Sequence, residues 1–308
     1  MAMGPDELQQ IAIVAHRFYK EGALQTEIAK ELGISRFKVA RMLEHARENG
    51  IVTIQINVPG SVDGELSVAL RQKYGLRRAF AVSTPSQDAQ SIHSSIGRVG
   101  AALLAEMCTE DDVLGVSSGR TLIAMAGHLR GLQRCDVVQL SGLVGAHQEN
   151  SAEIIRRVSG ISRGRAYSIY APLVVADART ARALRDEPSV RQTFDRFSAV
   201  TKAVIAIGSW SPPDSQMFNA LDVQTRERLV ERGVRAEVCA TPLDENGSPV
   251  DDVADRALAM HFEQLTRVPE IIAIAGGPKK TEAIRATLKG GFVTTMITDA
   301  ATARRLTR

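Results

Sequence analysis

The chain has 308 residues, of which 44% are hydrophobic and 24% are charged, and its formal net charge is +3. This length favours two globular domains, and the charge is too small to indicate nucleic-acid binding by itself. No apolar run approaches the roughly 18 residues of a membrane span. Three scattered cysteines, with no signal peptide, favour a cytoplasmic protein without a disulfide framework or a zinc site.

Residues 1–58 are predicted to form a winged helix-turn-helix. Apolar side chains at helical spacing predict one helix from about residue 7 to 20 and a second from about residue 25 to 32. Gly33 suits a turn, and Ser35 suits the N-cap of a third helix that ends near residue 49. The segment IVTIQINVP then alternates apolar and polar residues, which predicts a half-buried strand, the wing.

The third helix carries a local positive charge. Residues 36–47 contain four basic residues and one acidic residue in an otherwise neutral domain. An isolated basic run is more often a solvated surface, but a basic helix after this turn favours insertion into the major groove of DNA. The expected DNA-binding residues are Ser35, Arg36, Phe37, Lys38, Arg41 and Arg47.

Residues 59–308 are predicted to form a larger α/β domain after a short linker. Segments that are apolar throughout alternate with segments of helix length, which is typical of a parallel sheet covered on both faces. The expected strands are Arg77–Ser83, Asp112–Ser117, Cys135–Gly142, Ala203–Ser209, Glu270–Gly277 and Val293–Asp299.

Two of these strands end in residues that suit an anion. Parallel sheets bind ligands at the carboxyl ends of their strands. The turn SSGRT at residues 117–121 opens a helix, so its free N–H groups, the helix dipole and the Arg120 guanidinium favour a phosphate. The turn AGGPKK adds glycines for close backbone approach and the cations Lys279 and Lys280. Each turn taken alone is also compatible with a structural turn that holds no ligand.

The chain resembles the sorbitol-operon regulator (SorC) family, also described as sugar-binding DeoR-type regulators, over nearly its full length. The matching segments include EIAKELGISRFKVARML, VLGVSSGRTL, VVQLSGLVG, AIGSW, AGGPKKTEAI and GGFVTTMITDAATA. The resemblance implies an α/β protein: a winged helix-turn-helix joined to a Rossmann-like effector domain similar to glucosamine-6-phosphate deaminase and ribose-phosphate isomerases. It also implies operator DNA, a phosphorylated sugar or polyol and a homodimer or homotetramer as partners, with no cofactor.

The same resemblance implies which residues contact the effector. Glu237 stands where the family places an acidic residue near the sugar hydroxyls, and Lys280 stands where it keeps a lysine. Many members carry tryptophan at the position of Ser118, so the sugar itself is not indicated. The implied effector-binding residues are Ser117, Ser118, Gly119, Arg120, Thr121, Ser141, Asn150, Ser151, Glu237 and Lys280.

The main alternative is a sugar-phosphate isomerase or deaminase with an added N-terminal domain. Such an enzyme needs a positioned carboxylate or histidine as a proton shuttle. His93 and His147 lie in expected loops, Asp112 precedes a strand at the edge away from a site, and Glu237 suits hydroxyl binding better. We therefore expect no catalytic residue and no metal site, and predict a transcriptional regulator of a carbohydrate or polyol operon. The identity of the effector and the direction of its control stay open.

Overall fold

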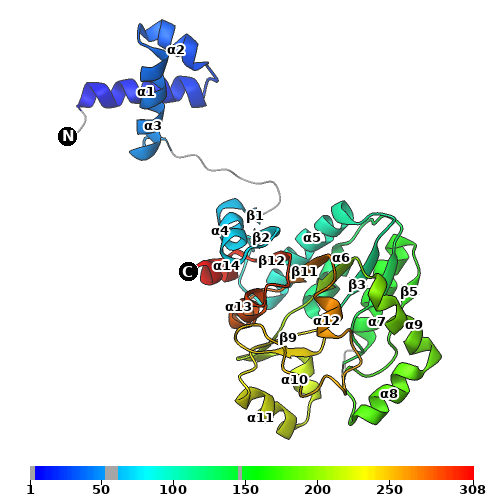
Figure 1. Ribbon diagram of the computed structural model, residues 1–308. Coiled ribbons are helices and arrows are strands. Elements are labelled where there is room, and N and C mark those ends of the chain that lie inside the picture. Colours follow the sequence, from blue (N-terminus) through cyan, green and yellow to red (C-terminus); the bar gives the residue numbers. More distant parts are fainter. Residues whose placement is uncertain (1–3, 53–61, 145–147) are drawn as a thin grey trace. The chain divides into compact units, whose positions relative to one another are not determined.

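Two compact units make up the chain, Met1–Asn57 and Val58–Arg308 (Figure 1). The computed structural model describes residues 4–52, 62–144 and 148–308, and the side chains of residues 148–151 lie outside that description. Most of the predicted wing and the predicted linker fall in residues 53–61, also outside the described residues. In the described ranges no helix is long and apolar enough to cross a membrane.

The N-terminal unit consists, in its described residues, of three helices packed around one apolar core. They are α1 (Pro5–Tyr19), α2 (Gln25–Leu32) and α3 (Arg36–Glu48). The core takes side chains from all three helices: Ile11, Val14, Ala15, Ile28, Ala29, Val39, Met42, Leu43 and Ala46. The three predicted helices are confirmed, with ends that differ by one or two residues.

The turn between α2 and α3 forms as the sequence predicts. Gly33 ends α2 with φ 64°, the left-handed conformation that glycine adopts without steric cost. Ser35 Oγ accepts a hydrogen bond from the backbone N of Lys38 at 3.2 Å, so it caps the start of α3. The first turn of α3 is thereby fixed in direction relative to α2.

The C-terminal unit is built, in its described part, on an eight-stranded sheet in the order β1-β2-β12-β11-β6-β3-β4-β5. Neighbouring strands are parallel except β1, which pairs antiparallel with β2. The strands are β1 (Val62–Asp63), β2 (Arg78–Val82), β3 (Val113–Val116), β4 (Asp136–Gln139), β5 (Ala166–Tyr167), β6 (Lys202–Ile205), β11 (Glu270–Ile274) and β12 (Thr295–Asp299). The prediction of a mainly parallel sheet is confirmed.

Helices cover both faces of this sheet, which explains why successive residues in the middle of its strands are apolar. On β11, Ile271 packs in the core of one face and Ile272 in the core of the other. The first face is covered by α4 (Gly64–Tyr74), α8 (Ala178–Asp186), α9 (Pro188–Arg196), α12 (Phe262–Leu265), α13 (Thr281–Lys289) and α14 (Ala300–Thr307). The second face is covered by α5 (Ala89–Met107), α6 (Arg120–His128) and α7 (Gln148–Ser162).

A second, smaller antiparallel sheet was not predicted. It has the order β10-β9-β7-β8. Its strands and the helices beside them in the chain are β7 (Gly208–Trp210), β8 (Pro213–Asp214), β9 (Ala236–Val238), β10 (Thr241–Leu243), α10 (Gln216–Ala220) and α11 (Val223–Glu231). The prediction of one strand at Ala203–Ser209 is therefore wrong, because β6 ends at Ile205 and β7 joins the other sheet. A Cβ atom on Gly208 would lie 2.2 Å from Glu237 Oε1, so glycine at this position leaves room for the Glu237 side chain beside β7.

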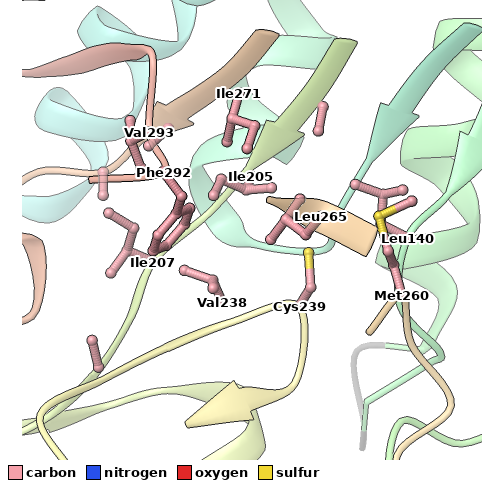
Figure 2. Packing of buried hydrophobic residues seen from close by; sticks show 14 of the residues in the cluster. Leu140, Ile205, Ile207, Val238, Cys239, Met260, Leu265, Ile271, Phe292 and Val293 are labelled. Carbon is pink, nitrogen blue, oxygen red and sulfur yellow. The ribbon is translucent and has the colours of Figure 1, made fainter. Parts of the chain in front are cut away.

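The smaller sheet is anchored on the core of the larger one. Figure 2 shows Val238 and Cys239 of the β9–β10 hairpin near Ile205, Ile207 and Leu265, and all five belong to one buried cluster. The two-residue turn of this hairpin has positive φ at both positions, 46° and 61°, as a type I′ turn requires. The hairpin therefore holds β9 in a fixed position beside the ends of the parallel strands.

Candidate functional site

A pocket of about 220 Å³ lies at the carboxyl ends of the parallel strands, against the smaller sheet. Eight of the sequence-predicted effector residues line it: Ser117, Ser118, Gly119, Arg120, Thr121, Ser141, Glu237 and Lys280. They come from segments that follow β3, β4 and β11 and from β9. The structure thus brings together residues that are up to 163 positions apart in the chain, as the strand-end argument expects.

Two further predicted residues, Asn150 and Ser151, lie in α7. Their side chains are outside the described residues. Their contact with an effector stays a prediction.

The turn at residues 117–121 brings a helix start to the pocket. Helix α6 begins at Arg120, and no side chain caps it in the described part of the chain. The first N–H groups of a helix have no partner inside the helix, so this end offers free donors. Ser117 has a structural role beside them, because its Oγ accepts a hydrogen bond from Ala206 N at 3.0 Å.

Glycine is required at the start of α6 by close packing. A Cβ atom on Gly119 would lie 2.6 Å from the Cβ atom of Ala206. The backbone of the turn therefore runs directly against the segment that connects β6 to β7.

The turn after β11 is held by a buried carboxylate. Gly277 has φ 100°, which favours glycine, and its N–H donates to Asp299 Oδ2 at 2.6 Å. The other oxygen of Asp299 accepts from Thr302 N at 2.9 Å and caps α14, as the sequence predicts. Asp299 thus fixes the turn that leads into Lys280, the last residue of the short 3₁₀ helix η3 (Pro278–Lys280).

Both cations of the pocket contact Asp214, which the sequence did not single out. The Arg120 Nη2 atom donates to Asp214 Oδ1, and Lys280 Nζ lies 3.3 Å from Asp214 Oδ2. Lys280 Nζ also donates to the main-chain oxygens of Asp214 and of Ile207, the latter at 2.9 Å. Arg120, Asp214 and Lys280 therefore form one charged network along the pocket wall.

The pKa values of Asp214 and Lys280 both lie below their ordinary values. Burial acts to raise the pKa of Asp214, but the charges of Lys280 and Arg120 outweigh it and hold that pKa below its ordinary value. Burial lowers the pKa of Lys280, and the carboxylates of Asp214 and Glu237 offset this only in part. The charged form of each residue is therefore supported by its neighbours.

Glu237 faces the pocket from β9 in a different electrostatic setting. Burial raises the pKa of its carboxyl, and the nearby charge of Lys280 only partly opposes this. Its Oε1 accepts a hydrogen bond from Ser215 Oγ at 3.1 Å. A carboxyl group held in this way suits contact with neutral hydroxyl groups better than contact with an anion.

His93 also lines the pocket, and the prediction that it lies in a loop is wrong. It belongs to the first turns of α5. Burial lowers its pKa, and the charge of Arg120 lowers it further, so the neutral imidazole is favoured. The apolar residues Ile92 and Ile96 beside it have helical spacing, which is the signal that could have placed it.

The structure does not describe a metal site. Among the described residues, no group of three or more His, Cys, Asp or Glu side chains is arranged to hold a metal ion.

In the N-terminal unit, the six predicted DNA-binding residues are all exposed. They are Ser35, Arg36, Phe37, Lys38, Arg41 and Arg47. Phe37 stands out because 84% of it is exposed, although it is a large apolar residue. The opposite side of α3 is buried against α1 and α2, so the exposed side is the one free to meet a partner.

The chain matches known proteins along nearly its whole length. Residues 61–308 match the family described as "Putative sugar-binding domain". The transcriptional regulator YjhU of Escherichia coli (strain K12) is 33% identical over 305 residues, covering 93% of this chain and 90% of YjhU. The transcriptional regulator LsrR of Enterobacter sp. (strain 638) is 29% identical over 312 residues, covering 99% of this chain and 94% of LsrR.

A solved structure shares the fold. The full-length sorbitol operon regulator SorC from Klebsiella pneumoniae superposes with a TM-score of 0.73 at 23% sequence identity. The match covers 98% of this chain and 100% of that chain.

Proposed function

This chain belongs to the SorC family of transcriptional regulators with a sugar-binding domain, and on that premise we propose that a small phosphorylated ligand controls its binding to operator DNA. The ligand, a sugar or polyol phosphate, binds in the pocket of the C-terminal unit. One observation carries the proposal: an uncapped helix start, two cations and a partly buried carboxyl from separate segments line the same pocket. The first three groups suit a phosphate, and the last suits hydroxyl groups.

The phosphate group binds at the start of α6. There the free N–H groups and the helix dipole attract an anion, and Arg120 adds a charge-assisted hydrogen bond. Lys280 approaches the same place from η3. The sugar end of the ligand then lies toward Glu237 and Ser141, with Asn150 and Ser151 as further contacts.

The N-terminal unit acts as a helix-turn-helix in which α3 enters the major groove. Arg36 and Phe37 at the start of α3 contact base edges, whereas Lys38 and Arg47 contact phosphates. Ser35 and Arg41 complete the surface. The support is that all of these side chains are exposed on the helix that follows the Gly33 turn.

The active form is a homodimer or homotetramer in the cytoplasm. One helix-turn-helix reads few base pairs, so specific affinity needs two half-sites presented by symmetric copies. Sedimentation at micromolar concentration, free and on DNA, measures this. A monomer under both conditions contradicts it.

The experiment that tests the proposed function combines a DNA selection with a ligand screen. Full-length protein selects duplexes from a random-sequence library, and anisotropy then measures affinity for the selected duplex with and without individual sugar and polyol phosphates. We expect salt-dependent, sequence-specific binding that at least one phosphate ester changes. Equal affinity for the selected and a scrambled duplex contradicts the proposal.

The same protein also tests the enzyme alternative. His93 and Glu237 line the pocket, and they are the kinds of group that an isomerase would use to move a proton. We expect no isomerisation or deamination of pentose or hexose phosphates. Turnover that is lost in Glu237→Gln would instead favour the enzyme.

A further inference from the structure

The two cations of the pocket already have an anionic partner in the protein. The carboxylate of Asp214 lies between the Arg120 guanidinium and the Lys280 ammonium, and each of its oxygens faces one of them. An anionic ligand group that used Arg120 and Lys280 would lie beside the carboxylate of Asp214, whose negative charge would repel it. The carboxylate and such a ligand therefore compete for the same two side chains.

We propose that Asp214 is an internal counter-ion, which the anionic group of the ligand displaces, and that this exchange releases residues 213–220 from the pocket wall. The inference rests on the proposed function, because it states how ligand binding changes the protein. It also names the ligand chemistry. A phosphate dianion displaces Asp214, whereas a sugar acid with a single carboxylate has no advantage in charge over Asp214 itself.

A ligand phosphate can replace the Asp214 carboxylate in its contacts with the two cations. The Asp214 side chain is 25% exposed and that of Arg120 is 52% exposed, so water weakens their attraction. The start of α6 adds free N–H donors beside these cations. A phosphate at that place gains the helix N–H groups in addition to the two cations, which gives it more donors than Asp214 now uses.

Asp214 is linked to other parts of the pocket wall through the residue that follows it in the chain. Strand β8 has only two residues, and Asp214 is its last. The next residue, Ser215, accepts a hydrogen bond from Phe218 N at 3.0 Å, which caps α10, and donates to Glu237 at 3.1 Å. Movement of Asp214 therefore changes both the start of α10 and the carboxyl group assigned to the sugar hydroxyls.

The first test is a calorimetric titration with inorganic phosphate at constant ionic strength. Asp214→Asn keeps the size of the side chain and removes its charge, so we expect phosphate to bind at least about tenfold more tightly than to the unaltered protein. The matched control is Asp186→Asn, which removes one charge from a surface ion pair with Arg191. It should leave the affinity unchanged. Equal or weaker binding to Asp214→Asn, or binding to neither protein, overturns the proposal.

The second test uses the unaltered protein and needs no variant to fold. Hydrogen exchange is compared with and without saturating phosphate. We expect faster exchange of the amides of residues 216–220 and slower exchange at residues 118–122. Slower or unchanged exchange at residues 216–220 overturns the proposal. Neither test uses DNA. A protein that does not bind operator DNA would therefore contradict the proposed function but would leave the role of Asp214 to be decided by these two tests.

Discussion

Two aspartate–lysine pairs lie at different ends of the parallel strands, and their surroundings differ. Asp112 stands just before β3, and its Oδ1 lies 2.6 Å from the Nζ of Lys202, which begins β6. The same oxygen accepts from Thr201 Oγ1 at 2.7 Å, while Oδ2 accepts from the N and Oγ1 of Thr109 at 2.8 and 2.9 Å. Both carboxylate oxygens of Asp112 thus accept hydrogen bonds from neutral groups, in addition to the contact with the Lys202 ammonium group.

Within the described residues, the carboxylate of the other pair accepts no hydrogen bond from a neutral group. Asp214 is held by the side chains of Arg120 and Lys280 and borders a pocket. Its side chain is 25% exposed, against 7% for Asp112. A carboxylate that is buried and fully hydrogen-bonded fixes the fold, whereas one held by charges beside a cavity can be exchanged for a ligand.

The largest expected effect is on stability, at the buried pair. Asp112→Asn leaves the Lys202 charge without its partner, so we expect it to lower the free energy of unfolding by roughly 3 kcal/mol. Asp214→Asn should lower it by less, because Lys280 keeps the main-chain oxygens of Ile207 and Asp214 as partners and the Asp214 side chain is 25% exposed. Urea denaturation measures both. Equal losses for the two variants would remove the distinction between the pairs.

The contribution of Asp112 to stability should depend on pH. Burial acts to raise the pKa of Asp112, but Lys202 and the threonine donors lower it to about 2. The folded-state pKa is below that of the unfolded chain, so the stabilisation is present above about pH 4 and is lost as the pH falls toward 2. We expect the difference in unfolding free energy between the unaltered protein and Asp112→Asn to narrow below pH 4. A difference that widens in acid contradicts this.

The next effect concerns ligand affinity at the pocket pair. Lys280→Ala removes a charge-assisted contact, so we expect the affinity for the effector phosphate to fall by about 1.5–3 kcal/mol. Lys279→Ala is the matched control, because Lys279 is exposed and does not line the pocket. Calorimetry with inorganic phosphate measures both variants. If Lys279→Ala loses as much affinity as Lys280→Ala, the contact with the anion is not specific to the pocket.

In the N-terminal unit, replacing the exposed cations Arg36 and Lys38 of α3 should reduce DNA affinity in two different ways. Arg36→Ala should cost roughly 1–3 kcal/mol on the selected duplex and relax the preference at one base pair. Lys38→Ala should weaken binding to all duplexes alike and reduce the salt slope by about 1. Anisotropy against a panel of single-base variants separates the two. Unchanged affinity in both variants contradicts the DNA role of α3.

The smallest expected effect belongs to Phe37. Its exposed ring suits contact with the methyl group of thymine, and one such methyl contributes about 0.8 kcal/mol when buried. Replacing thymine by uracil at the contacted position should weaken binding to the unaltered protein and leave binding to Phe37→Ala unchanged. Sensitivity to uracil that persists in Phe37→Ala assigns the methyl contact to another residue.

The sequence predicts the parts of the pocket that follow long buried strands. Residues 117–121 and Lys280 could be found because β3 is apolar throughout, β11 is apolar after Glu270, and the carboxyl ends of both strands must meet at one edge of the sheet. The position of Asp112 before β3 likewise indicated that it lies away from the site, and it pairs there with Lys202.

Asp214 could not be found in the same way. It lies in a two-residue strand of the smaller sheet, and so short a strand has no periodicity to read. Its partners, Arg120 and Lys280, are separated from it by 94 and 66 positions. Only the packing of β7 against β9 brings β8 to the pocket, and that packing depends on contacts between distant segments.

The central claim is that a phosphate group is the part of the ligand through which the pocket controls DNA binding. The most direct measurement titrates the complex of protein and selected duplex with the active sugar phosphate and with the same sugar lacking phosphate, at constant ionic strength. We predict that the phosphorylated sugar changes DNA affinity at a concentration at least about tenfold lower than the unphosphorylated sugar requires. Only the phosphorylated form engages the start of α6 and both cations. If the unphosphorylated sugar acts at the same concentration, the account of the pocket is wrong.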